Sequence, residues 1–314
     1  MRATSCTLLV ALLFFFRAST ALSAATTDPY PIYPPGISSL NFTEIRFRLL
    51  LMGGPVSPVY NEEVEAYIRR YLTYGAADSE AILGRSVALF PIFEHYLAAY
   101  GLPDELKFLP IVESELVPYA VSVKGAAGLW QFIPSTARAM GLVVDQYLDE
   151  RKDPYKSTEA AVKYLKRLFE RFGTWELALA AYNCGPTRVS RVLQNSDCAD
   201  FWKIRDQLPR ETQRYVSRYL AASYLANYYT LHGITPVWPT SAALDVMAAR
   251  IYKSLSLPTV AKLTGLDVAT IKQLNPAINK AYVPAIKNGF FLVLPRASWY
   301  DYLDAQSRVG VVQP

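Results

Sequence analysis

Apolar residues with a helical period fill most of the first two thirds of the chain. From Asn61, a residue type that caps helices, apolar positions recur at four-residue steps, at Val64, Ile68 and Leu72. Several later stretches end in an aromatic residue followed by glycine, which readily adopts the left-handed conformation that closes a helix. Alternating strand patterns are nearly absent before His232. We therefore predict a mainly α-helical domain for this part of the chain.

Further helices are expected downstream in this part. Ser157 should cap one with a regular apolar face, and Thr174 should cap the next, an apolar helix that runs to Tyr182 and Asn183. Pro209 suits the first turn of a last, long helix, because its ring fixes the backbone angle that a helix needs.

The last quarter of the chain has a different pattern. Residues 243–252 and the apolar run 289–295 read as strands, and two short helices lie between them, over 258–265 and from Asp267 onwards. The Pro-containing segment 234–241 separates this pattern from the helical part. A strand, two helices and a strand predict a small, separate α/β module of βααβ order.

These changes of pattern divide the chain into consecutive segments. The predicted boundaries are a signal peptide (1–25), a Pro-rich tether and N-terminal segment (26–60), a helical N-terminal extension (61–102), a helical central domain (103–233), a linker (234–241), the α/β module (242–296) and a C-terminal tail (297–314).

The N-terminus has the features of a secretory signal. Arg2 supplies a positive start, residues 8–16 are apolar, and small residues follow up to Ala25. The apolar run is too short to span a bilayer comfortably, so an uncleaved anchor is the less favoured alternative. We expect an exported protein that is periplasmic or associated with the cell envelope.

Composition narrows the class of protein further. Hydrophobic residues make up 52% and charged residues 19% of the 314 residues, which is typical of an ordered globular protein. The net charge of +5 is too small and too dispersed to indicate a nucleic-acid partner. We expect a monomer.

The cysteines and histidines leave one question open and exclude another. In an oxidising compartment, Cys184 and Cys198 could form a disulfide, and two free thiols are an equal alternative. His95 and His232 stand at unrelated positions, so no metal site is indicated, and we expect no cofactor.

One carboxylate stands out chemically. Glu113 directly follows an apolar run, residues 108–112, and apolar surroundings disfavour the charged form of a carboxyl group. Its pKa should therefore be raised, so that it can hold a proton near neutral pH and act as a general acid. The alternative is a solvated glutamate at the end of a helix.

Four short blocks around Glu113 and downstream of it carry a resemblance to a known family. The blocks are Glu113-Ser114 followed by Pro118, Ala120, Ser122, Gly125 and Ala126; Gly128-Leu129-Trp130-Gln131 with Pro134, Thr136 and Ala137; Ala181-Tyr182-Asn183; and Glu211-Thr212 leading to Tyr215. In this order they resemble the lytic murein transglycosylases with a goose-type lysozyme-like fold, of the membrane-bound lytic murein transglycosylase D type. The resemblance covers about residues 100–232. The tail region, with Leu274-Asn275-Pro276 and a closing strand, resembles a divergent LysM module.

The resemblance implies a reaction and a set of site residues. Glu113 would be the catalytic acid and then base, acting on the β-1,4 bond between N-acetylmuramic acid and N-acetylglucosamine in peptidoglycan and leaving 1,6-anhydromuramic ends. The residues implied to bind the glycan strand are Ser122, Gln131, Tyr182, Asn183 and Tyr215. Cys184 departs from the family, in which many relatives have a small residue after the Tyr-Asn pair.

The carboxylates of the sequence agree with a single acid. Glu115, two residues after Glu113, would point to another face of a helix, and Asp145, Asp149, Glu150 and Asp153 lie in a charged loop that we expect to be solvated. A glycosidase that inverts the configuration of the anomeric carbon needs a second carboxylate roughly 6.5–9.5 Å from the acid. Two alternatives stay open: a goose-type lysozyme-like hydrolase that uses water, and a non-catalytic scaffold that only binds peptidoglycan.

Overall fold

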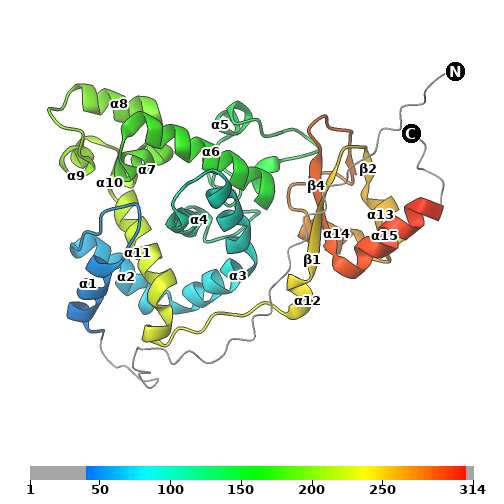
Figure 1. Cartoon of the computed structure of the whole chain (residues 1–314), viewed down its shortest axis with the longest axis horizontal. Coiled ribbons are helices and arrows are strands. Elements are labelled where there is room, and N and C mark those ends of the chain that lie inside the picture. The colour runs from blue at the N-terminus through cyan, green and yellow to red at the C-terminus, as the bar shows by residue number, and fades with distance from the viewer. Residues whose placement is uncertain (1–39, 309–314) are drawn as a thin grey trace.

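The structure is a computed structural model that describes residues 40–308, and most of the described part is helical (Figure 1). The helices of the first domain are α1 (Phe42–Leu51), α2 (Glu62–Leu72), α3 (Ala76–Ala99), α4 (Leu109–Ser114), α5 (Pro134–Ala139), α6 (Pro154–Phe172), α7 (Trp175–Cys184), α8 (Pro186–Gln194), α9 (Phe201–Ile204), α10 (Arg210–Gln213) and α11 (Tyr215–Tyr228). The prediction of a mainly α-helical domain is confirmed.

Side-chain caps explain where several of these helices begin. Asn61 caps α2 by accepting a hydrogen bond from the Val64 amide, as predicted. The predicted cap of α6 is wrong, because Asp153 rather than Ser157 accepts from the first free amides of that helix. Pro154 stands at the first helical position, where its missing N–H costs nothing, and Ser157 lies inside the first turns, where its hydroxyl donates to the Asp153 carbonyl.

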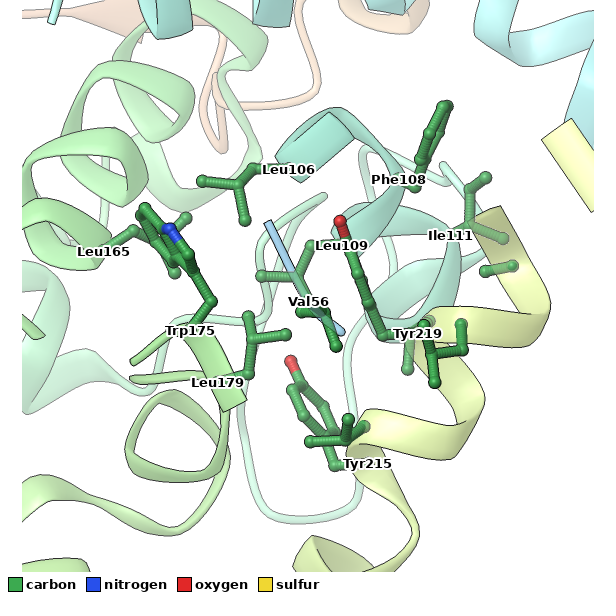
Figure 2. Packing of buried hydrophobic residues seen from close by; sticks show 14 of the residues in the cluster. Val56, Leu106, Phe108, Leu109, Ile111, Leu165, Trp175, Leu179, Tyr215 and Tyr219 are labelled. Carbon is green, nitrogen blue, oxygen red and sulfur yellow. The ribbon is translucent and has the colours of Figure 1, made fainter. Parts of the chain in front are cut away.

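Helix α11 lies at the centre of the domain, packed against α2, α4 and α7. Its side chains are buried on nearly all sides, which is why its sequence lacks a polar face. Figure 2 shows the rings of Tyr215 and Tyr219 extending from α11 into a cluster of aliphatic side chains that includes Leu109 and Leu179. This packing fixes the position of both tyrosines relative to α4.

The N-terminal part of the described chain adds a helix that the sequence did not indicate. Helix α1 lies within the segment predicted as a Pro-rich tether and N-terminal segment, and it buries Ile45 and Leu49 completely in the core of the first domain. The predicted signal peptide lies outside the described residues. Within residues 40–308, no helix is both long enough and apolar enough to cross a bilayer.

The second domain contains the short strands of the described chain. Its elements are α12 (Ser241–Leu244), β1 (Val246–Ile251), β2 (Leu255–Ser256), α13 (Leu257–Thr264), α14 (Val268–Leu274), β3 (Tyr282–Val283), β4 (Phe290–Pro295) and α15 (Arg296–Arg308). Strand β1 pairs with β4 in antiparallel register, with Val246 opposite Pro295, and β2 pairs with β3. The predicted strand–helix–helix–strand order is present, with the short β2–β3 pair added to it.

Helix α15 belongs to the second domain. It occupies most of the segment predicted as a C-terminal tail, and it packs Trp299 and Tyr302 into the core of the module. The Trp299 indole N–H donates to the Met247 carbonyl of β1, at 2.7 Å. The apolar residues that make this packing span a single turn of α15. An apolar pattern of that length is too short to indicate a helix from the sequence.

The two domains are in direct contact. Leu148, in the loop before α6, is buried in the core of the module and forms a β-bridge with Ile278. The amide of Asp149 donates to the Ala277 carbonyl at 2.8 Å. The second domain is therefore docked on the loop that precedes α6.

The predicted linker also lies against the first domain. The Val237 amide donates to the Glu80 carbonyl of α3 at 3.0 Å. A Cβ atom at Gly84 would lie 2.0 Å from the Val237 carbonyl oxygen, so the close approach of the two backbones requires glycine at this position. The linker is thus a packed, extended segment that runs from α11 along α3 to α12 (Figure 1).

Candidate active site

Glu113 lies near the end of α4, behind an apolar run. The preceding Leu109 and Val112 are buried, whereas Glu113 itself keeps some accessible surface. The helix ends immediately afterwards, because Glu115 takes the left-handed conformation with φ of 53°. The sequence therefore carries one carboxyl group out of the core and stops the helix at that point.

Burial dominates the electrostatics of Glu113. It raises the pKa of Glu113 from 4.5 to about 7, because the charged form loses its hydration. A hydrogen bond from Tyr215 and the positive charge of Arg218 act in the opposite direction, and the negative charge of Glu211 adds to the increase. A carboxyl group with this pKa is about half protonated at neutral pH, as a general acid requires.

Tyr215 connects α11 to the acid. Its hydroxyl donates a hydrogen bond to Oε1 of Glu113, and its side chain is only 1% exposed. Arg218, one turn further along α11, donates to the Val112 carbonyl at 2.8 Å. Helix α11 thus holds both the carboxylate and the backbone that carries it. The sequence resemblance implied a glycan contact for Tyr215, and in the structure it is a core residue that contacts Glu113.

Gln131 lies in the loop between α4 and α5, with a left-handed backbone (φ of 48°). Its side-chain amide nitrogen donates to the Gly128 carbonyl at 2.8 Å and to the Ala120 carbonyl at 3.4 Å. Both N–H groups of the amide are therefore directed at the loop backbone, and its carbonyl oxygen is the atom left to accept a bond from a ligand.

Ser122 is exposed and stabilises a turn of the same loop. Its hydroxyl oxygen accepts from the Ala126 amide at 3.0 Å, and its own amide donates to the Ala126 carbonyl at 2.8 Å. The Ser122 hydroxyl thus stabilises the turn, and its hydrogen is still able to donate to a ligand.

Tyr182 and Asn183 lie at the end of α7, as the sequence indicated. The Tyr182 hydroxyl donates to the Trp130 carbonyl at 2.7 Å rather than to Glu113. Burial raises the pKa of Tyr182 well above its usual value, and the charge of Glu113 adds to this increase. Asn183 accepts a hydrogen bond from the Thr212 hydroxyl of α10 at 2.7 Å.

Sequence reasoning missed Arg151, which holds the Gln131 loop in place. Its guanidinium donates to the carbonyls of Gly125, at 2.7 Å, and Phe132, at 3.1 Å. It also makes two hydrogen bonds of 2.8 Å to the Asp149 carboxylate. The backbone of Arg151 lies so close to the same loop that a Cβ atom at Gly128 would be 1.7 Å from the Arg151 carbonyl oxygen.

The prediction of a solvated charged loop is wrong for three of its four carboxylates. Asp149, Glu150 and Asp153 are buried, and only Asp145 is exposed. Buried charges require partners, and here Arg151 pairs with Asp149 while backbone amides pair with Asp153 and Glu150. A run of charges gives no sign of this pairing in the sequence, because the partners are brought together by the fold.

Cys184 and Cys198 are both free thiols in the structure, so the disulfide that the sequence left open is not formed in it. Cys184 is the last residue of α7. Burial raises the pKa of the Cys184 thiol, which favours the unreactive protonated form.

Two family profiles match the chain in its two domains. Residues 91–205 match the Transglycosylase SLT domain, and residues 248–309 match the Lytic transglycosylase MltD, LysM-like domain. Glu113, Gln131 and Tyr182 lie inside the first match, and Tyr215 lies ten residues beyond its end. The second match includes the whole of helix α15.

Curated relatives agree with these matches. The chain is 38% identical over 186 residues to membrane-bound lytic murein transglycosylase D of Escherichia coli K12, covering 57% of this chain and 40% of that protein. It is 32% identical over 186 residues to peptidoglycan transglycosylase gp16 of Escherichia phage T7, covering 58% of this chain and 14% of that protein.

The 70 kDa soluble lytic transglycosylase of E. coli is 26% identical and matches with a TM-score of 0.40, over 49% of this chain and 26% of that chain. The chain spans about two fifths of the length of the membrane-bound lytic murein transglycosylase D that it matches. The chain therefore carries a region similar to the transglycosylase SLT domain, followed by a region similar to the LysM-like domain of the MltD type, and it resembles the lytic murein transglycosylases.

Proposed function

We propose that the protein cleaves the β-1,4 bond between N-acetylmuramic acid and N-acetylglucosamine in peptidoglycan, with Glu113 as acid and then base, and leaves 1,6-anhydromuramic ends. One observation carries the proposal. Glu113 is a partly accessible carboxyl group whose pKa is raised to about 7, and Tyr215 of the central helix holds it by a hydrogen bond.

A single carboxyl group is sufficient for this reaction. Protonated Glu113 gives its proton to the glycosidic oxygen as that oxygen leaves C1 of the muramoyl residue, and the carbonyl oxygen of the N-acetyl group stabilises the positive centre. Ionised Glu113 then removes the proton of the C6 hydroxyl, whose oxygen bonds to C1 and closes the anhydro ring. The nucleophile is part of the substrate, so no water has to be positioned.

The residues around Glu113 fit distinct tasks in this scheme. The free carbonyl oxygen of Gln131 suits an acceptor for an N-acetyl N–H, and the Ser122 hydroxyl can donate to a sugar oxygen. Tyr182 donates to the Trp130 carbonyl, and Asn183 accepts from the Thr212 hydroxyl. Through these bonds the two residues shape the wall that the sugar would contact.

The main alternative, a lysozyme-like hydrolase, would need a second carboxylate, and Glu211 is the candidate. It is exposed, and it is the described carboxylate whose charge raises the pKa of Glu113. In a hydrolase it would be a candidate to orient water. Its oxygen lies 3.3 Å from the Lys124 ammonium, and this contact favours a structural role for Glu211.

The mass of the product ends separates the two reactions. Digests of purified peptidoglycan should contain 1,6-anhydromuramic ends, and reducing ends in their place would overturn the proposal. Glu113→Gln should abolish cleavage, whereas Glu211→Gln should leave the product type unchanged. The Glu113→Gln protein should still sediment with peptidoglycan. The scaffold alternative is tested by the unmodified protein itself, because that alternative predicts no cleavage of peptidoglycan.

We propose further that the protein is exported to the cell envelope and that the LysM-like domain adds binding to glycan strands. Deletion of 241–314 should then weaken binding to intact walls more than it slows cleavage of soluble fragments. Because the deletion exposes Leu148, the truncated chain should also carry Leu148→Gln to keep that surface polar. Equal wall binding by full-length and truncated protein would count against the role of the module.

A further inference from the structure

A hollow of about 390 Å³ lies beside the candidate active site, and none of the roles above uses it. It is lined by Tyr67 and Arg70 of α2, by Arg210 and Glu211 of α10, and by Arg214 and Arg218 at and after the start of α11. Four of these six side chains are guanidinium groups and one is a carboxylate. The hollow is therefore strongly cationic.

The four arginines differ in how they are held. Arg218 is half-buried and fixed by its bond to the Val112 carbonyl, and the Arg214 guanidinium lies 3.7 Å from a Glu63 oxygen. Among the described residues, Arg70 and Arg210 have no carboxylate within ion-pair distance. Their guanidinium groups can therefore take an anionic ligand without first breaking an ion pair.

The hollow is electrostatically connected to the acid. Arg218 and Glu211 line it, and both change the pKa of Glu113. A narrow crevice that shares Tyr67, Arg70 and Arg218 with the hollow continues to Ile111, two residues before Glu113. The hollow thus adjoins the helix that carries Glu113.

The crevice also has acidic groups in its wall. Asp78 and Glu115 line it and do not line the hollow. These carboxylates confine the positive potential to the wider hollow, so that the site suits a small anionic group at its mouth and repels an extended polyanion.

We propose that this hollow binds a carboxylate of the peptide stem on the strand being cleaved. The inference rests on the proposed function and deepens it. The stem is attached to the muramoyl residue, whose C1 would lie at Glu113, and an extended stem of four residues reaches about 13 Å from its attachment point. Guanidinium groups recognise carboxylates by paired, charge-assisted hydrogen bonds.

The test compares two substrates and two variants of the full-length protein. Arg70→Gln/Arg210→Gln removes the two arginines without an ion-pair partner. Arg167→Gln/Arg191→Gln is the matched control, because both of these residues are exposed and lie outside the hollow. The substrates are glycan strands with their stems and the same strands after enzymatic removal of the stems.

The unmodified protein and the control should have a lower KM on strands with stems than on bare strands. The Arg70/Arg210 variant should raise KM about 10-fold on strands with stems, which corresponds to the loss of one charge-assisted contact, and should leave bare strands unaffected. The variant Arg70→Lys/Arg210→Lys should retain part of the preference, since lysine keeps the charge but not the paired geometry. An equal KM increase on both substrates would overturn the proposal, as would no preference in the unmodified protein.

Binding measurements separate this proposal from the function on which it rests. With Glu113→Gln as background, calorimetric titration with a soluble stem-bearing disaccharide should give weaker binding when Arg70 and Arg210 are replaced. Amidation of the stem carboxylates should likewise weaken binding to the protein that retains Arg70 and Arg210. These results would stand even if the product ends proved to be reducing. Weaker binding of inorganic phosphate, without any change for the stem-bearing disaccharide, would identify a phosphate site and overturn the proposal.

Discussion

Tyr215 and Glu113 are 102 residues apart in the sequence, and the hydroxyl of Tyr215 donates a hydrogen bond to the carboxylate of Glu113. The tyrosine is fixed by the core around α11, whereas Glu113 lies near the end of a short helix. The orientation of the acid is therefore set by a distant, rigid element. The bond also stabilises the charged form of Glu113, so Tyr215 limits how far burial can raise the pKa.

Replacement of Tyr215 by phenylalanine tests this relationship. The pKa of Glu113 should move above 7, because the bond that lowers it is lost, and the alkaline side of the pH–rate profile should shift to higher pH. We expect kcat at the optimum to fall about 10-fold or more as the carboxyl group loses its orientation. The measurement is a pH–rate profile on soluble muropeptide strands.

Tyr219→Phe is the matched control for this variant. Tyr219 lies one turn further on the same helix, is equally buried, and donates to the Glu105 carbonyl at 3.0 Å rather than to Glu113. Both variants should lose about 1–2 kcal/mol of folding free energy. A shift of the pH profile in both variants, or in neither, would contradict the role given to Tyr215.

The raised pKa of Glu113 also predicts how stability depends on pH. The folded protein binds this proton more tightly than the unfolded chain, so the contribution to stability is complete below pH 4.5 and is lost as pH rises through about 7. Glu113→Gln removes this dependence. Between pH 4.5 and pH 8, the free energy of unfolding of the variant should rise by about 3 kcal/mol relative to that of the unmodified protein. Urea unfolding of both proteins at several pH values measures the difference, and parallel curves would show that burial does not raise the pKa.

Gly128 should tolerate no side chain. A methyl group there would meet the Arg151 carbonyl at 1.7 Å, and the residue has φ of 82°, so Gly128→Ala should cost more than about 3 kcal/mol and abolish activity. Gly125→Ala in the same loop is the control, because φ is 77° there but nothing lies within 4 Å of the added atom. It should cost only about 1 kcal/mol of backbone strain. Equal melting temperatures for the two variants would refute the close packing of the loop on Arg151.

Arg151 should matter through the loop that it holds. Arg151→Lys keeps the charge but cannot bind the Gly125 and Phe132 carbonyls while pairing with both oxygens of Asp149. We expect a loss of about 2–4 kcal/mol of folding free energy, since buried polar groups lose their partners. KM should rise more than kcat falls, because the Gln131 loop is displaced while Glu113 is not. A fall in kcat alone would argue against this account.

The sequence singled out Glu113 as the candidate acid but gave no sign of Arg151, which holds the Gln131 loop. Glu113 could be recognised because its signal is local, an apolar run followed by one carboxylate, and because Gln131 and Tyr182 stand in short blocks of a known family. Arg151 could not, because the burial of a charged side chain depends on partners that the fold brings from Gly125 and Phe132. A charged stretch looks alike in sequence whether it is solvated or paired inside the protein.

Helices with local capping signals were predictable from the sequence, whereas helices held by long-range packing were not. The caps Asn61 and Thr174 followed from residue type, since the capping bond is made within a few residues. Ser157 was misplaced because two residues near the start of α6 could cap it, and only Pro154 at the first helical position decides for Asp153. Helices α1 and α15 were missed because a few large side chains, among them Ile45 and Trp299, fix them by long-range packing.

The insertion of Leu148 into the core of the second domain has a consequence for how the chain melts. A leucine that is buried to this degree contributes about 2 kcal/mol to the contact, and the bridge to Ile278 adds backbone bonds to it. The same loop carries Asp149, which pairs with Arg151 beneath the Gln131 loop. Heating that detaches the LysM-like domain should therefore also loosen the active-site loop, and a calorimetric scan of residues 40–308 should give one cooperative transition rather than two.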